Sequence, residues 1–512
     1  MTLKKILTLL LVAILCLGFA ACGQTGGKTD TSAAQEKEDT VAKKLDPVTL
    51  KIYIPGDKPA AMDDVVAEAE KRMADSVNAK LDIIWMPWSE ITNKISVTMS
   101  SGEPVDLMFD KPDMGMPGRI KQGLYEPLDD LLDKYGQNIL KVRPKVMWDA
   151  NMYGDKKYCI PLGATHGDSF TFYVRKDIRE NLGFQPIKSL DELIKFAYLV
   201  RENDKNIVPI TCGDTNFGFR LVRWDYDMNI KSAPGIAPEN LIIYLKQNDG
   251  KVYNLLDTKE PKIMEALSKL TEYYKGGLFG PSPLAMNWDE IMNLMKSGGV
   301  AIAGYAPYGV LGDVQSSLKA AVPGAEYEEA IFDTLEPKKW VSDFAQWNFI
   351  LVPKTAKNKE RAIMFLDWAN AAQENYDLLA YGIEGKQWKM LDDGRYQFTG
   401  SDYRWFPYDW IWNPVQDRIA DGLDAKALKH EKAIREADFF IPSALTGFHF
   451  DQSPVQNEVA HFNSIYSTIW KTMSYGAVSP EDALKQLESE AGDTIRKITA
   501  DYQKQIDAFL KK

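Results

Sequence analysis

Carboxylates and an ammonium group follow two of the strands that the sequence predicts near its start. Asp57 and Lys58 come directly after the expected strand Val48–Ile54, and Asp110 comes directly after Val105–Phe109. Such groups make charge-assisted hydrogen bonds, which are strong and suit a polar ligand. Both aspartates could instead cap the helices that follow them, and capping does not exclude a ligand contact.

The elements around these residues alternate between strand and helix spacing. We expect a helix over Met62–Leu81, a strand over Leu81–Trp85 and a helix over Trp88–Ser101. This β-α-β-α-β order predicts an α/β fold with a parallel sheet covered on both faces. In such folds ligands bind beyond the carboxyl ends of the strands, which makes the residues at those ends candidates for a site.

A second α/β unit is predicted after Pro161, and the chain crosses between the two units more than once. Its expected strands include Ser169–Val174 and Val300–Ala303, and Asn248-Asp249-Gly250 is a strong turn signal for a hairpin. Further elements are expected at Asp177–Leu182, Leu190–Glu202, Ile207–Thr211, Lys262–Tyr274, Trp347–Val352 and Glu360–Tyr381.

Aromatic residues are frequent for an acidic chain, with 13 Trp and 23 Tyr. A Trp side chain suits either a core or a stacking platform for a ligand. Trp224 stands between charged neighbours, which favours a platform, whereas Trp347 lies in an alternating strand and fits a core as well as a cleft. Glu384, in a Gly-Ile-Glu-Gly sequence, fits either a tight turn or an exposed functional carboxylate.

The first 21 residues carry the features of a secretory signal peptide. Lys4 and Lys5 precede an apolar run from Ile6 to Phe19, and the pair Ala20-Ala21 is small. The run is too short to span a bilayer comfortably, so we expect export and cleavage.

Residues 19–22, Phe-Ala-Ala-Cys, resemble the lipobox of bacterial lipoproteins, in which the thiol is diacylated before cleavage. The resemblance implies lipidation of Cys22, with a chance cysteine behind an ordinary signal peptide as the alternative. Residues 23–46 hold no aromatic side chain and predict a flexible tether, which would reach on the order of 25 Å. Residues 22–46 would thus hold a globular body at the outer face of the cell membrane.

Composition limits the remaining possibilities. The 72 acidic and 61 basic side chains give a net charge of −11, which disfavours nucleic acid as a partner. The 512-residue chain is long enough for at least two domains. Cys159 and Cys212 remain after processing, and they fit free buried thiols or one disulfide.

No motif for catalysis or metal binding is present. The sequence lacks a His-Glu-x-x-His zinc motif and a Gly-x-Ser-x-Gly nucleophile motif. We therefore expect neither a metal nor another cofactor, and no enzymatic activity. A surface glycoside hydrolase is the rival, since that chemistry needs only two carboxylates.

Five segments in order resemble family 1 extracellular solute-binding proteins. They are Gly102–Leu107 (GEPVDL), Gln122–Asp129 (QGLYEPLD), Tyr158–Pro161 (YCIP), Phe172–Asp177 (FYVRKD) and Met295–Ile302 (MKSGGVAI). Lys359–Leu366, Tyr381–Lys386, Gly447–Asp451 and Tyr502–Ile506 resemble the large Gram-positive carbohydrate-binding lipoproteins with an extra C-terminal domain.

The resemblance implies a two-lobed, periplasmic-binding-protein-like fold of type II, in which hinged lobes close on a ligand. It implies a monomeric receptor that delivers an oligosaccharide to the permease subunits of an ABC importer. A receptor for another polar solute, such as a peptide, is the alternative. The expected domains are residues 47–160 with about 343–400 for one lobe, and 161–342 with about 401–512 for the other and its helical extension.

The resemblance also adds ligand contacts. In the family pattern they come from the loops after the first and third strands, the crossing after Pro161 and the loop after Val300–Ala303. In this chain those loops hold Asp57, Lys58, Asp110, His166, Asp168, Tyr305 and Tyr308. The last helix, starting at Ser479-Pro480, carries one long apolar stripe and is predicted to pack on the body.

Overall fold

The computed structural model describes residues 45–163, 172–212, 230–237, 240–246, 249–286, 288–304, 311–330, 341–403, 410–421, 423 and 425–511. Predictions made for Cys22, His166, Asp168, Trp224, Tyr305 and Tyr308 lie outside these residues.

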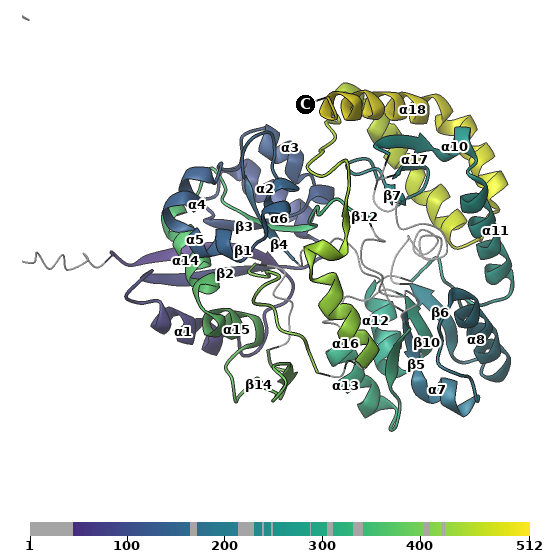
Figure 1. The fold of residues 1–512 in the computed structure, drawn as a ribbon, viewed down its shortest axis with the longest axis horizontal. Helices are drawn as coiled ribbons and strands as arrows, with labels where there is room; N and C mark the ends of the chain where they lie inside the picture. Colours follow the sequence, from purple (N-terminus) through teal and green to yellow (C-terminus); the bar gives the residue numbers. More distant parts are fainter. Residues whose placement is uncertain are drawn as a thin grey trace, which may run out of the picture. The chain divides into compact units, whose positions relative to one another are not determined.

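The first sheet has five strands in the order β2-β1-β3-β13-β4. Figure 1 labels its strands β1, β2, β3 and β4. Strands β1 (Val48–Pro55), β2 (Ala79–Met86) and β3 (Leu107–Asp110) are parallel, as the sequence predicts. Strand β13 (Asn348–Leu351) comes much later in the chain and pairs antiparallel with both β3 and β4 (Cys159–Leu162). We call the part of the chain built on this sheet lobe 1.

The helices of lobe 1 come from two parts of the chain, one before and one after the long segment between β4 and β13. Early helices are α1 (Met62–Arg72), α2 (Ile91–Ser101), α3 (Met116–Lys121), α4 (Asp129–Tyr135), α5 (Gln137–Lys141) and α6 (Lys145–Asp149). Helices α14 (Lys359–Ala371) and α15 (Gln373–Tyr381) follow β13, where α14 packs on α4 and α5, and α15 packs on α1. A small hairpin, β14 (Trp388–Met390) with β15 (Tyr396–Phe398), comes next.

Helix ends and one domain boundary in lobe 1 differ from the sequence prediction. Helix α1 ends at Arg72, and Asn78, at φ 47°, turns the chain into β2. Ala372 is extended, which divides the helix predicted over Glu360–Tyr381 into α14 and α15. Tyr403, Trp410 and Ile411 pack in the lobe 1 core, so the chain leaves this lobe later than the boundary predicted near residue 400.

The second sheet has the order β11-β5-β10-β6 and forms the centre of lobe 2. Its strands are β5 (Phe172–Arg175), β6 (Val208–Cys212), β10 (Val300–Gly304) and β11 (Tyr327–Ala330), and β6 is parallel to β10. The accompanying helices are α7 (Lys176–Asn181), α8 (Leu190–Asn203), α10 (Leu255–Thr258), α11 (Pro261–Lys275), α12 (Trp288–Ser297) and α13 (Leu311–Ala321). A smaller antiparallel sheet, β7 (Ile230–Ser232), β8 (Ile243–Lys246) and β9 (Lys251–Asn254), contains the hairpin predicted at the Asn-Asp-Gly turn.

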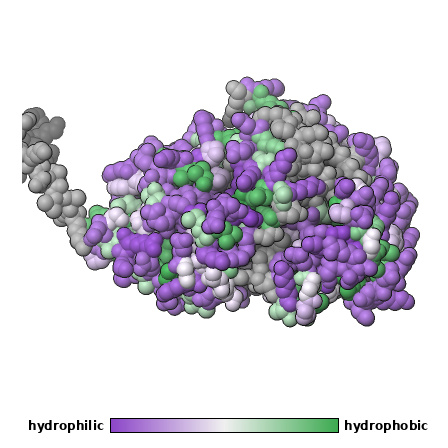
Figure 2. All heavy atoms as spheres, turned by 60° about the horizontal axis from the view of Figure 1, so that its bottom comes forward, coloured by the Kyte–Doolittle hydropathy of each residue, from purple (hydrophilic) through white to green (hydrophobic). Residues whose placement is uncertain are grey.

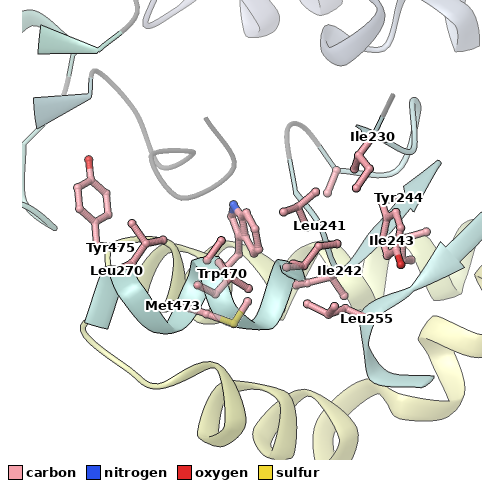
Figure 3. Packing of buried hydrophobic residues seen from close by; sticks show 14 of the residues in the cluster. Ile230, Leu241, Ile242, Ile243, Tyr244, Leu255, Leu270, Trp470, Met473 and Tyr475 are labelled. Carbon is pink, nitrogen blue, oxygen red and sulfur yellow. The ribbon is translucent and has the colours of Figure 1, made fainter. Parts of the chain in front are cut away.

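The C-terminal helices complete the core of lobe 2. Trp470 and Met473 of α17 (Gln456–Ser474) pack with Leu270 of α11 and with Leu241 and Ile242 (Figure 3). Helix α18 (Pro480–Phe509) begins at the predicted N-cap, where the Ser479 hydroxyl accepts a hydrogen bond from the Asp482 amide at 3.2 Å. Its predicted apolar stripe is buried in the same core: Leu484, Leu487, Ala491, Ile495, Ile498, Tyr502 and Ile506.

Hydrophilic residues prevail on the face drawn in Figure 2, and hydrophobic ones form small separate patches. Among the helices in the described part of the chain, none combines the length and apolar character that a membrane span requires. The Cys159 thiol is free and buried, as predicted, and burial raises its pKa, so it stays protonated.

The two lobes are joined by a polar cluster at the second crossing. Asn151, after α6, donates to the Phe344 carbonyl at 3.3 Å and accepts a hydrogen bond from the Gln346 amide at 2.9 Å. Asp343 in the same segment forms an ion pair with Lys231 of β7 at 2.6 Å, with both side chains mostly buried. Strand β12 (Val341–Ser342) also pairs with β16 (Ile441–Pro442) from the C-terminal region.

His449 is half-buried near Asp343 of this cluster, and its Nε2 atom is buried. Its ring stacks on Tyr153 of lobe 1 at 4.3 Å between centroids, and Nε2 has no hydrogen-bond partner among the described residues. Burial lowers the pKa of His449 to about 4, although Asp343 and the Met152 backbone oppose that shift. The structure therefore contains the neutral imidazole at physiological pH.

The burial of His449 predicts a loss of stability at low pH. Its pKa in the folded protein lies below the ordinary value of 6.5, so the unfolded chain binds more protons between pH 6.5 and 4. The contribution is complete above pH 6.5 and is lost as the pH falls to 4, by on the order of 3 kcal/mol.

Urea denaturation at several pH values measures this effect. His449→Phe keeps an aromatic ring against Tyr153 and should flatten the pH dependence over that interval, whereas His461→Gln, on the exposed surface of α17, serves as the matched control. Equal slopes for wild type and His449→Phe would contradict the prediction.

Candidate functional site

Five chain segments meet at one end of the lobe 1 sheet, where its parallel strands terminate, and we call this end the edge. Strands β1, β2 and β3 end there, because Pro55 pairs with Met86 and β3 is in register with β1. The antiparallel strand β13 begins there, because Phe349 pairs with Asp110, and Asn348 pairs with Leu162, so β4 also ends there. The edge therefore brings together the residues after β1, β2, β3 and β4 and the residue before β13, which is Trp347.

The corresponding edge of the lobe 2 sheet is formed by Gly304, Phe172 and Cys212, which pair across β10, β5 and β6. The chain continues from this edge into residues 164–171, 213–229 and 305–310, outside the described residues. These segments contain the predicted site residues His166, Asp168, Trp224, Tyr305 and Tyr308. Residues 164–171 also connect the two edges, from Gly163 to Phe172.

Asp57 and Lys58 are exposed after β1, as a ligand contact requires. Helix α1 has Ala61 at its N-cap and no side-chain cap, so Asp57 does not cap this helix. The Lys58 ammonium lies 2.7 Å from Asp63 in an exposed ion pair, which contributes little and leaves the ammonium accessible.

Asp110 lies in a different environment from the one that the sequence suggested. Its carboxylate is fully buried and accepts hydrogen bonds from the Arg119 Nε at 2.8 Å, the Arg119 Nη2 at 2.6 Å and the Tyr125 hydroxyl at 2.6 Å. The Lys111 amide donates to it at 2.8 Å. Burial raises the pKa of Asp110, and these hydrogen bonds oppose the rise.

The predicted ligand contact of Asp110 is therefore replaced by a structural role. Both of its oxygens are engaged within the protein, and the carboxylate has no exposed surface for a sugar hydroxyl. Arg119 also donates to the Met114 carbonyl at 2.7 Å, so the pair holds the loop that follows β3. The helix-cap alternative is not seen either, because the next helical turn has Lys111 at its N-cap.

Trp347 and Glu384 have distinct surroundings. Trp347 is half-buried at the sheet edge, next to the buried Gln346. Glu384 is exposed in the tight turn between α15 and β14, where Gly382 and Gly385 adopt φ values of 92° and 80°. The backbone of Glu384 forms a bridge with Trp388, which fits the tight-turn alternative. Its exposed position also fits the ligand contact that the sequence suggested.

Trp412, which follows the β14–β15 hairpin in the chain, also lies at this edge, next to Gly163. A Cβ at Gly163 would lie 2.4 Å from the Gln346 Oε1 and 3.6 Å from the Trp412 ring, so only glycine allows this packing. The buried Arg143 fixes the arrangement by donating to the carbonyls of Pro161 at 2.7 Å and Trp412 at 3.4 Å.

Trp88 is a candidate site residue that sequence reasoning missed. It follows β2 at the same edge, and 44% of its surface is exposed. The helix predicted from Trp88 begins instead at Ile91, which places Trp88 in the loop. The rule that selected Asp57 and Asp110, that residues after parallel strands bind ligands, would have found it with a correct helix start.

A model of the bacterial extracellular solute-binding protein family matches residues 56–376, which is more than half of the chain. The chain belongs to this family. A second model, a domain of unknown function (DUF3502), matches residues 444–511, which include α17 and α18.

One relative of this solute-binding protein matches nearly its whole length, and another matches about three quarters of it. It is 25% identical to a carbohydrate ABC transporter substrate-binding protein of Streptococcus pneumoniae over 98% of this chain and 97% of the relative. It is 22% identical to lipoprotein LipO of Bacillus subtilis over 76% of this chain and 74% of the relative.

The N-glycan transport solute-binding protein NgtS of S. pneumoniae has a similar solved structure. The TM-score is 0.73 at 22% identity, over 91% of this chain and 99% of that one. This likeness supports the predicted two-lobed α/β fold with a helical C-terminal region.

A pair of substitutions separates the roles of Asp57 and Asp110. Asp110→Asn leaves the Arg119 guanidinium buried without its counter-charge and should lower the free energy of unfolding by about 3 kcal/mol. Asp57→Asn, at an exposed position, should change it by less than about 0.5 kcal/mol. Urea denaturation measures both, and an Asp110→Asn protein of wild-type stability would contradict the structural role.

Proposed function

We propose that this protein captures an oligosaccharide outside the cell and delivers it to the permease of an ABC importer. The observation that carries the proposal is the edge of the lobe 1 sheet. Exposed polar and aromatic side chains lie at this edge, from which the chain leaves for the corresponding edge of the lobe 2 sheet. The full-length S. pneumoniae relative is a carbohydrate receptor, and NgtS has been solved with Man1GlcNAc and Man5GlcNAc.

The chemistry of the edge suits a sugar. A sugar ring offers apolar C–H faces to aromatic side chains and hydroxyl groups to charged ones. Lobe 1 would supply Asp57, Lys58 and Trp347. Lobe 2 and the crossing would supply the predicted contacts His166, Asp168, Trp224, Tyr305 and Tyr308.

The proposed mechanism is closure of the lobes over the ligand. A ligand shifts an equilibrium between open and closed forms only if it binds the closed form more tightly, so it must touch both lobes. The expected hinges are the two places where the lobes join, near Pro161 and near Val341–Ala345. No catalytic step is needed, and the protein acts as a monomeric receptor.

A thermal-shift and calorimetric screen tests this function. Man1GlcNAc, Man5GlcNAc, other oligosaccharides and short peptides are offered to the purified mature protein. A bound sugar at a hundred times its Kd should add about 2.7 kcal/mol of stability. Small-angle scattering should show a smaller radius of gyration when the sugar is bound.

The rival functions give different outcomes in the same screen. Binding of peptides but not of sugars would replace the carbohydrate receptor with a peptide receptor. New reducing ends during incubation with an oligosaccharide would indicate a glycoside hydrolase. Saturable binding at constant dimensions would contradict closure and leave the ligand class intact.

We also propose that Cys22 is lipidated and anchors the protein at the outer face of the cell membrane. The lipobox-like sequence supports this, and LipO is a lipoprotein relative. Two or more acyl chains keep a protein attached where one chain would let it dissociate. Residues 23–46 would act as the tether.

Cys22→Ser tests the anchor. The variant should be released into the medium or should accumulate as an uncleaved precursor, with the melting temperature of the folded body unchanged. Cell fractionation with immunoblotting measures its distribution. Processing and membrane association at the wild-type level would contradict lipidation.

A further inference from the structure

Trp88 is the one aromatic residue among the exposed large hydrophobic side chains in the described part of the chain. The other members of this group are aliphatic: Val97, Met390, Val415, Ile441 and Leu510. Because an exposed Trp leaves a large apolar surface in water, its position at the ligand edge calls for an explanation.

The indole ring is held in place rather than freely mobile. It makes an edge-to-face contact with Phe109, at 5.8 Å between centroids and an interplanar angle of 90°. Phe109 is fully buried in β3, and Pro87 precedes Trp88 and restricts the backbone. A ring that is already ordered loses little conformational entropy when a ligand stacks on it.

The surface beside the ring carries a cation and an open backbone position. The Lys111 ammonium lies over the Trp88 ring, 5.9 Å from its centre, in a cation–π contact. Gly56 follows β1, the strand between β2 and β3, with φ at 100°, and a Cβ there would meet no atom within 4 Å. The space beside Gly56 is therefore open.

Polar groups suitable for hydroxyls surround this open space. Asp57 follows Gly56 and is exposed, and its carboxylate has no hydrogen bond among the described residues. The Lys111 ammonium is 3.7 Å from Asp113, a distance that leaves its donors available.

We propose that Trp88, Gly56, Asp57 and Lys111 form an outer subsite for one pyranose ring of the oligosaccharide. The apolar face of the ring stacks on the indole, the Asp57 carboxylate accepts hydrogen bonds from its hydroxyls, and the Lys111 ammonium, displaced from over the indole, donates to them. This inference rests on the proposed function and adds the position and length of the ligand.

The width of the sheet gives the required length. Trp88 follows β2, and Trp347 precedes β13, which is three strands away in the order β2-β1-β3-β13. Three spacings of about 4.8 Å amount to roughly 14 Å, more than one pyranose ring can cover. A ligand that contacts both Trp residues must have several rings, so the subsite favours longer glycans over disaccharides.

Calorimetry with glycans of two lengths tests the subsite. The probes are three pairs: Man1GlcNAc and Man5GlcNAc, maltose and maltopentaose, and cellobiose and cellopentaose. For the pair that binds, Trp88→Ala should weaken the longer glycan about five- to tenfold and the shorter one less than twofold. Trp88→Phe should restore most of the loss, and Val97→Ala, exposed on α2, is the matched control.

A double-mutant cycle adds a second measurement. If Trp88 and Asp57 bind the same ring, the binding losses caused by Trp88→Ala and Asp57→Asn should be non-additive for the longer glycan. For the shorter glycan the two losses should simply add. Thermal unfolding of each variant establishes that the fold is intact.

The outcomes are distinct. Wild type that binds none of the six probes and no other glycan in the wider screen overturns the proposed function and the subsite together. Binding of a glycan pair with equal losses at both lengths, or with less than a twofold loss for Trp88→Ala, overturns the subsite alone. Unchanged glycan binding with reduced uptake by cells would instead assign Trp88 to a protein contact.

Discussion

Strand β13 is the constraint on which the rest of the structure depends. It lies between β3 and β4 and hydrogen-bonds to both, although some 190 to 240 residues separate it from them in sequence. Lobe 1 is therefore incomplete until the chain has passed through lobe 2 and returned. This return places Trp347 and the joint segment 343–346 beside the ends of β3 and β4, where the proposed ligand site lies.

The joint between the lobes combines buried contacts at its centre with exposed contacts at its periphery. At the centre, Asn151 and the Lys231–Asp343 pair fix the return segment by buried hydrogen bonds. At the periphery, Lys121 of α3 lies 2.9 Å from Asp451, with both side chains about half exposed. Such a pair contributes at most about 1 kcal/mol, so it can bias the relative position of the lobes without locking it.

At this edge of the lobe 1 sheet, a buried charged group indicates a structural role, whereas exposed aromatic and charged groups are candidates for ligand contact. Asp110 is the most buried acid there, and its four hydrogen bonds leave no capacity for a ligand. Asp57 and Trp88 are exposed, and they keep a carboxylate and an indole face available. Exposure, rather than acidity alone, therefore distinguishes the proposed ligand contacts in lobe 1.

Local patterns in the sequence determined the elements that depend on neighbouring residues. The parallel strands β1, β2 and β3, the N-cap of α18 at Ser479 and the buried stripe of that helix were all predicted correctly, because strand alternation, helix spacing and capping act over a few residues. The family motifs added the two-lobed fold. Tertiary structure alone decided the burial of Asp110, because strand and capping patterns do not show that the Arg119 guanidinium and the Tyr125 hydroxyl fold back onto its carboxylate. It also decided that α2 begins only at Ile91, which leaves Trp88 in the loop, and that α14 and α15 are separate helices. Packing against other elements overrides helix propensity at such boundaries.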